Sequence, residues 1–115
     1  MIQKSSQMET EVRENMRGGK GKVEITHVLK QSQLTGKCRL VGKITLKPGC
    51  SIGLHPHENE EEIYYILKGK ALVDDNGAMS ELGEGDVILT GGGASHSVEN
   101  ISDETLEIFA FILLY

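Results

Sequence analysis

The sequence has no long hydrophobic run among its 115 residues. Its longest apolar stretch is the last eight residues, 108–115, whereas a membrane-spanning helix needs about 20. Residues 1–16 are polar and charged and lack the apolar stretch of a secretory signal peptide. We therefore expect no membrane partner and a cytoplasmic protein.

The sequence also has few cysteines and no excess of positive charge. Two cysteines, Cys38 and Cys50, are too few for the disulfide framework of a small secreted domain, so reduced thiols are expected. Lys and Arg number 12 against 17 Asp and Glu, a net charge of −5, which leaves no basic surface to neutralise many phosphates. The composition therefore argues against nucleic acid as a partner.

What the sequence does contain points to one small β domain. Its length suits a single domain, and its 38% of hydrophobic residues, with 14 glycines, bring the apolar fraction near the globular average. That fraction is enough to bury a core. Because glycine is abundant and proline numbers only 2, the chain suits tight turns between short strands, which favours an all-β fold.

Hydrophobic periodicity supports that fold class. From Val23 onward, apolar and polar residues alternate with a period of two, which is typical of strands with one solvated face. Turn signals such as Asn76-Gly77 separate the predicted strands. These strands cover 23–30, 38–47, 63–67, 70–74, 86–90, 95–100 and 105–114. Short strands spaced by turns predict a small sandwich or barrel over residues 23–115.

Residues 1–22 do not share this pattern. Residues 1–16 are rich in Glu, Gln, Ser and Lys, which favours a mobile tail or a short docking helix, and we expect no site residue there. The segment 17–22 is a Gly-rich basic loop whose backbone can cradle an anion, yet it matches neither the Walker A motif nor the dinucleotide fingerprint. A plain flexible loop is the favoured interpretation, so residues 1–22 are expected to form an N-terminal tail and Gly-rich loop leading into the barrel.

The last predicted strand is apolar on both faces. Residues such as Ile108 and Ile112 occupy one face, while Phe109 and Phe111 occupy the other. An edge strand of a monomer cannot bury both, so we predict a homodimer in which the partner subunit covers one face. Coverage by the N-terminal segment of the same chain is the alternative.

Three of the four histidines stand where the ligands of a metal ion would lie. His55 and His57 are two residues apart, so in a strand both imidazoles project from one face. Glu62 begins the next strand after an acidic turn, and His96 follows a Gly-rich turn. Three neutral nitrogens and one carboxylate oxygen suit a borderline divalent ion. The fourth histidine, His27, is interpreted as a structural or surface residue.

The spacing around these residues is more specific than the residues alone. A first pattern has Gly, five residues, His, one, His, four, Glu, six, Gly, and it runs from Gly49 to Gly69. A second runs from Gly85 through Gly91-Gly92-Gly93 and His96 to Asn100. The two patterns match the two motifs of the cupin superfamily, which the chain resembles over residues 40–112 or so. The one departure is Gly91, where the second motif usually has Pro.

This resemblance implies the all-β cupin fold, a double-stranded β-helix or jelly-roll barrel that holds one divalent metal ion. The residues at the ligand positions are His55, His57, Glu62 and His96. Short single-domain cupins with this ligand set look most like the oxalate decarboxylase and germin branch, in which manganese binds a small carboxylate. Manganese is therefore the first candidate, with iron, zinc or nickel as alternatives.

The same resemblance exposes a second departure. In the decarboxylases an arginine commonly stands three positions before the first motif histidine to hold the substrate carboxylate, and here that position is Ile52. Arg39 could substitute from another strand, but parity predicts that it faces outward with Lys43.

Two choices concern the residues beside the predicted ligands. Glu62 fits the first motif, whereas Glu61 would need a shorter spacing; Glu58, Glu60 and Glu61 are interpreted as an exposed acidic turn that attracts the cation. Tyr64 shares a strand face with Glu62. Its phenol either orients a ligand in the pocket or is a core hydroxyl with a satisfied hydrogen bond.

A metal with open coordination positions can bind a small molecule through two oxygens. The chain is therefore predicted to be a metal-dependent enzyme, of the decarboxylase or dioxygenase type, acting on a small carboxylate or another oxygen-chelating metabolite. No general acid or base is recognisable beyond the ligands, so the catalytic residues stay unassigned. A non-catalytic, metal-dependent module that binds or senses a small molecule is the alternative.

Overall fold

The computed structural model describes all residues, 1–115, and contains ten strands and three short 3₁₀ turns. The strands are β1 Glu9–Glu14, β2 Lys22–Leu29, β3 Cys38–Leu46, β4 Ser51–Pro56, β5 Glu60–Lys68, β6 Ala71–Asp75, β7 Ala78–Leu82, β8 Val87–Gly91, β9 Ser95–Asn100 and β10 Leu106–Leu114. The 3₁₀ turns are η1 Ser5–Gln7, η2 Met16–Gly18 and η3 Gln31–Gln33. No helix is long and apolar enough to cross a membrane.

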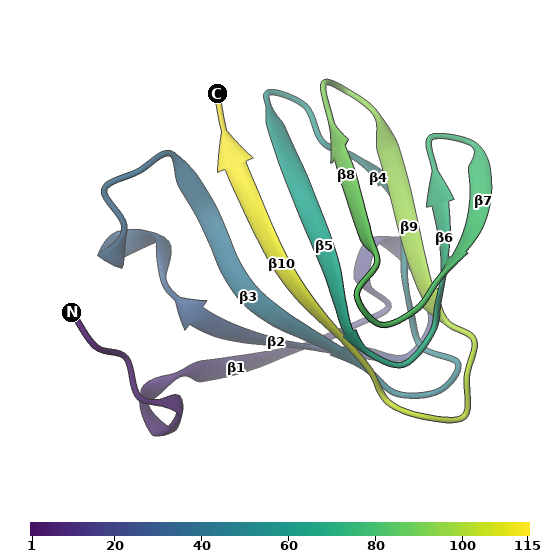
Figure 1. Cartoon of the computed structure of the whole chain (residues 1–115), viewed down its shortest axis with the longest axis horizontal. Helices are drawn as coiled ribbons and strands as arrows, with labels where there is room; N and C mark the ends of the chain where they lie inside the picture. The colour runs from purple at the N-terminus through teal and green to yellow at the C-terminus, as the bar shows by residue number, and fades with distance from the viewer.

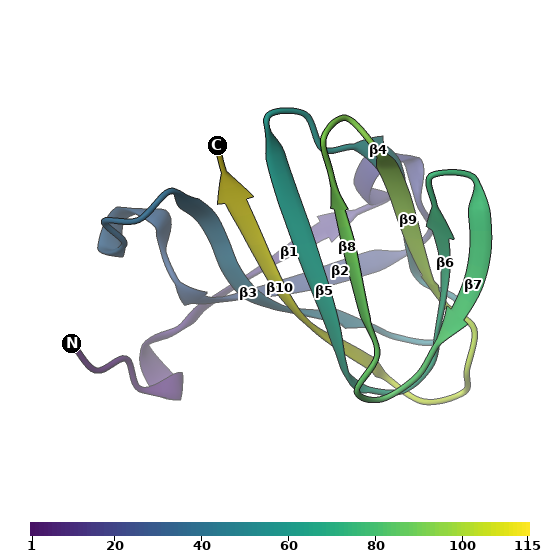
Figure 2. The ribbon, with the colours of Figure 1, turned by 45° about the horizontal axis from the view of Figure 1, so that its top comes forward.

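The strands form two antiparallel sheets that face each other (Figure 1). The larger sheet has the order β1-β2-β3-β10-β5-β8, and the smaller has the order β4-β9-β6-β7. Because β4 and β5 follow each other in sequence but belong to different sheets, the chain crosses between the layers there. Figure 2 shows the larger sheet curving, so that β1 and β2 pass behind β10 and β5. The predicted all-β sandwich or barrel is confirmed, and each predicted strand is present, most of them with ends shifted by a few residues.

The prediction of a mobile tail or docking helix is wrong for residues 9–14, which form β1. This strand pairs with β2 in the register Glu9↔His27 to Glu14↔Lys22. Thr10 and Thr26 also share a hydrogen bond of 2.9 Å between their hydroxyls. Nearly every residue of β1 is exposed, so its sequence carries no apolar alternation, and main-chain hydrogen bonds to β2 supply the pairing instead.

The last strand, β10, is central in the larger sheet, whereas the prediction of a homodimer treated it as an edge strand. β10 lies between β3 and β5 and pairs with both. Its inner face is buried through Leu106, Ile108, Ala110 and Ile112, while Phe109 and Phe111 on the outer face are half-buried, with ring centroids 4.7 Å apart. The apolar pattern on both faces therefore accompanies a central position in the sheet.

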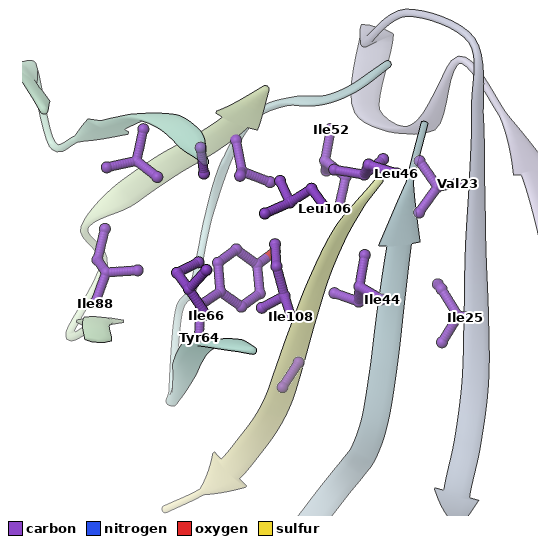
Figure 3. Packing of buried hydrophobic residues seen from close by; sticks show 14 residues of the cluster. Val23, Ile25, Ile44, Leu46, Ile52, Tyr64, Ile66, Ile88, Leu106 and Ile108 are labelled. Carbon is purple, nitrogen blue, oxygen red and sulfur yellow. The ribbon is translucent and has the colours of Figure 1, made fainter. Parts of the chain in front are cut away.

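The hydrophobic core lies between the two sheets. It comprises fourteen buried residues, which come from both layers. Figure 3 shows the ring of Tyr64 among them, beside Ile66 and Ile108. Tyr64 and Ile66 share the inner face of β5 with Glu62, so β5 carries one face that is apolar in the core and charged at its beginning. The core therefore holds the strand that positions the candidate ligand Glu62.

Candidate metal centre

Four predicted ligands come together inside the barrel. His55 is on β4, His57 follows that strand directly, Glu62 is on β5 and His96 is on β9. One potential ligand atom from each lies within 4.8 Å of the others. All four side chains are buried, with exposed fractions of 6%, 2%, 3% and 1%. Residues up to 41 positions apart in sequence thus form one cluster.

Strand pairing explains this convergence. His55 on β4 lies directly opposite His96 on β9. The main chain of His57 is tied to the loop before β9, because its N–H donates to the Ala94 carbonyl at 3.0 Å and its carbonyl accepts from the Gly93 N–H at 2.9 Å. Glu62 reaches the same point from the opposite sheet.

The Nδ1 atom of each clustered histidine has its own partner. Nδ1 of His55 lies 2.7 Å from the Gly53 carbonyl oxygen, and Nδ1 of His57 lies 2.6 Å from Oε2 of Glu60. Since these partners only accept hydrogen bonds, both Nδ1 atoms carry the proton, and in the neutral rings both Nε2 atoms are lone-pair donors. Nδ1 of His96 lies 2.9 Å from the Thr90 hydroxyl.

The opposite ring nitrogens face one another across a small space. Nε2 of His96 is 3.1 Å from Nε2 of His57 and 3.2 Å from Nε2 of His55. Oε1 of Glu62 is 2.9 Å from Nε2 of His57 and 3.0 Å from Nε2 of His96. Lone pairs that converge on one point repel each other unless a cation or proton lies among them. The donor set therefore fits a divalent metal ion.

Burial and hydrogen bonding set the charges of the cluster. Burial lowers the pKa of His55, which favours the neutral ring that a metal requires. Burial also lowers the pKa of His57, but the hydrogen bonds of its protonated ring to Glu62 and Glu60 outweigh it, so this pKa is raised. The contact with Glu62 then places a proton on Nε2, where a metal ion would bind in its stead. Burial raises the pKa of Glu62, yet hydrogen bonds from His57 and His96 outweigh it, so this pKa is lowered. Glu62 is thus a carboxylate at neutral pH, and its charge attracts a cation.

Glu60 is not part of an exposed acidic turn, in contrast to the prediction. Its side chain is largely buried between His57 and Arg39. Nε and Nη2 of Arg39 donate to its two carboxylate oxygens, both at 2.8 Å. This bidentate contact, with the His57 hydrogen bond, lowers the pKa of Glu60 to about 2. Glu60 therefore orients His57 from outside the cluster, whereas Glu62 belongs to it.

The alternation of faces predicted that Arg39 faces outward with Lys43, but Arg39 lines the cavity instead. On β10, Ile112 pairs with Leu40 and Leu113 pairs with Cys38, so Arg39 has no partner in this register. This irregularity is a β-bulge, which breaks the alternation of faces along β3. Both Arg39 and Leu40 consequently line the cavity above the cluster.

That cavity has a volume of about 190 Å³. Its apolar walls are Met16, Ile25, Leu40, Ile44, Tyr64 and Ile112. Its polar lining combines the candidate ligands His55, His57 and Glu62 with Glu11, Arg13, Arg17, His27 and Arg39. The space is below the roughly 300–1,000 Å³ typical of sites for drug-sized ligands, so it suits a small molecule.

Tyr64 belongs to both the core and the site. It lines the cavity, and its ring stacks on His96 with centroids 4.7 Å apart and an interplanar angle of 20°. Complete burial and the charge of Glu62 raise its pKa well above the usual value, so the phenol stays neutral. Tyr64 therefore packs in the core and also lines the cavity beside His96.

The N-terminal segment contributes residues that the sequence did not indicate. Glu11, Arg13 and Met16 line the cavity, so the expectation that residues 1–16 lie away from the site is wrong. His27 also lines the cavity, where its Nε2 lies 2.9 Å from Glu11, but it is not in the four-residue cluster. The sequence did not indicate these cavity residues, because β1 is largely polar and lacks the apolar alternation by which a strand is recognised.

Comparison with known proteins agrees with this architecture. The family model described as "Cupin domain" matches residues 42–112. The oxalate-binding protein of Thermotoga maritima is 46% identical over 114 residues, which are 99% of this chain and 94% of that protein.

Solved structures give the same result. The crystal structure of a predicted oxalate decarboxylase from Thermotoga maritima, 46% identical, superposes with a TM-score of 0.94 and covers 100% of both chains. The polyketide cyclase RemF of Streptomyces resistomycificus shares the fold at 19% identity, with a TM-score of 0.78 over 99% of this chain and 80% of that one. The jelly-roll fold expected from the two spaced motifs is thereby confirmed, and this chain belongs to the cupin family.

Proposed function

We propose that this protein is a metal-dependent cupin that binds a small carboxylate, with oxalate as the first candidate. The observation that carries the proposal is the buried cluster of three imidazoles and one carboxylate at a cavity of about 190 Å³. Arginines in the cavity lining add positive charge for an anionic ligand. The 46% identity to a protein named for oxalate binding supports the same ligand class.

His55, His57, Glu62 and His96 would hold one divalent metal ion. The bound ion would act as a Lewis acid that accepts carboxylate oxygens and stabilises negative charge on them. Three nitrogen ligands and one oxygen ligand are compatible with manganese, our first candidate, and also with iron, zinc or nickel. The chain's own part is to orient the imidazoles through Gly53, Glu60 and Thr90.

Turnover of the carboxylate, by decarboxylation or by oxygen-dependent cleavage, is the second candidate function. Both Glu11 and His27 line the cavity and lie 2.9 Å apart, so the cavity contains groups that can hold or move a proton outside the ligand cluster. Without such transfer, the same site is a binding or sensing module.

A homodimer in the cytoplasm completes the proposal. The outer face of the larger sheet carries apolar side chains that are exposed in one chain, including Tyr65, Leu67, Val87 and Leu89. They adjoin the half-buried Phe109 and Phe111 through the pairing of β10 with β5 and of β5 with β8. A contiguous apolar face of this kind favours a second copy as its partner. The two cysteines are both free, as suits a reducing compartment.

The experiment has two stages. Elemental analysis of tag-free protein purified without chelator measures the metal per chain, and we expect close to one. Calorimetric titration with oxalate then compares metal-loaded with chelator-treated protein, and binding is expected only in the loaded form. A protein that neither contains nor takes up metal contradicts the metal site, while a loaded protein that ignores oxalate and other small carboxylates contradicts the ligand class. Release of carbon dioxide from oxalate, with and without oxygen, separates turnover from binding.

A further inference from the structure

The cavity is lined by three arginines, and two of them are already paired. Arg13 donates to Glu11 at 3.1 Å, and Arg39 makes the bidentate contact with Glu60. Arg17 lines the same cavity, but its guanidinium has no ion pair and no side-chain hydrogen bond. It is therefore the arginine of the lining whose charge is left for a ligand.

The backbone at Arg17 is unusual for an arginine. Its φ of 55° and ψ of 30° fall in the left-handed region, which bulky residues rarely adopt. Asn15 also has a positive φ, but asparagine tolerates this conformation well. Such backbone strain persists only where surrounding structure enforces it, and it concentrates at functional sites.

The turn that contains Arg17 packs closely against β4. A Cβ atom at Gly53 would overlap the carbonyl oxygen of Arg17, and one at Gly19 would overlap the main chain of Ser51. Glycine at both positions thus allows the turn around η2 to lie directly on β4. The carbonyl of Gly53 is also the hydrogen-bond partner of His55, so Arg17 is fixed close to the metal cluster.

From this arrangement we infer that Arg17 recognises the carboxylate of the ligand, in the cavity that it lines together with the candidate metal ligands. The inference rests on the proposed function and adds the residue that selects for negative charge. It also assigns a role to the basic Gly-rich segment 17–22: the segment presents one arginine to an anion, instead of wrapping it with backbone amides. A guanidinium matches the planar, two-oxygen geometry of a carboxylate.

The test is calorimetric titration of oxalate into manganese-loaded protein. Arg17→Gln removes the charge but keeps an unbranched polar side chain, and we expect the Kd for oxalate to rise about tenfold or more. Arg17→Lys keeps the charge without the planar fork and should recover part of the affinity. Lys20→Gln is the matched control, because Lys20 is exposed in the same loop but does not line the cavity, and it should bind oxalate as the unmodified protein does.

Manganese content and the midpoint of thermal unfolding show whether Arg17 acts only through the structure. Unchanged values in Arg17→Gln, with weaker oxalate binding, support direct recognition. Equal oxalate affinity in Arg17→Gln and the unmodified protein overturns the role of Arg17 alone. If manganese content or the midpoint of thermal unfolding falls together with the oxalate affinity, this role is also overturned, since the residue is then structural. Failure of the unmodified, loaded protein to bind oxalate instead overturns the proposed function on which this role rests.

Discussion

The main-chain carbonyl of Gly53 accepts a hydrogen bond from Nδ1 of His55 at 2.7 Å. The same glycine has no room for a side chain, because the carbonyl oxygen of Arg17 occupies the space where a Cβ would lie. One residue therefore fixes the ring of a candidate metal ligand and seats the N-terminal turn on the barrel. Neither role is visible in the two cupin motifs.

Replacing Gly53 by alanine should destabilise the protein by about 1–3 kcal/mol, the usual range for overpacking a tight site. The extra methyl group must push η2 away from β4 or shift β4 itself. Denaturant unfolding of the metal-free protein measures the change. Gly36→Ala is the control, since a Cβ there meets nothing within 4 Å and the φ of Gly36 is not positive. Equal stability of the two variants would contradict the packing argument.

His96→Ala should remove most of the bound metal, because it deletes one of the four convergent ligands. His27→Ala should leave the metal content unchanged, although His27 lines the same cavity and contacts Glu11. Elemental analysis of both purified variants, with circular dichroism to verify folding, provides the measurement. Equal loss of metal in the two proteins would rule out the ligand assignment.

Glu60→Ala should weaken metal binding by about 10- to 100-fold, the range found when a partner that orients a ligating histidine is lost. The variant leaves Nδ1 of His57 without its carboxylate acceptor and frees Arg39. Competition with a chelator of known affinity measures the change. Glu58→Ala is the matched control, since Glu58 is exposed in the same turn. If both variants retain the affinity of the unmodified protein, Glu60 does not orient His57.

Leu89→Glu should convert the proposed dimer to a monomer. Leu89 is 58% exposed on the outer face of the larger sheet, and burying a carboxylate there against a second copy is unfavourable. Leu54→Glu is the control, because Leu54 is equally exposed, at 58%, but lies on the smaller sheet. Light scattering coupled to size exclusion gives the molar mass. A monomeric unmodified protein, or a dimer that survives Leu89→Glu, would refute this interface.

The sequence predicted the barrel and the residues of the buried histidine and glutamate cluster because both depend on regular spacing. Alternation with a period of two placed Glu62 and Tyr64 on one inner face, and the spacing of the two motifs identified His55 and His96 although they are 41 residues apart. Such patterns survive because each strand must present one face to the core.

Features that interrupt regular geometry could not be predicted. The bulge at Arg39 reverses its face, and no residue type in β3 announces it. The burial of Glu60 could not be predicted, because its partner, Arg39, comes from another strand and is brought close only by the tertiary structure. β1 was missed because a polar edge strand lacks the apolar alternation by which strands are recognised.

No residue among 1–22 is buried, whereas every buried residue that builds the core or the metal cluster comes from Val23 onward. Exposed positions generally tolerate substitution with changes of about 0.5 kcal/mol or less. Exposed side chains of β1 and η2 can therefore be exchanged while the core and the buried cluster stay unchanged. The residue that we propose for ligand recognition, Arg17, and the buried cluster of three histidines and Glu62 therefore lie in separate stretches of the chain. Under this proposal, substitutions that change the ligand need not disturb the cluster.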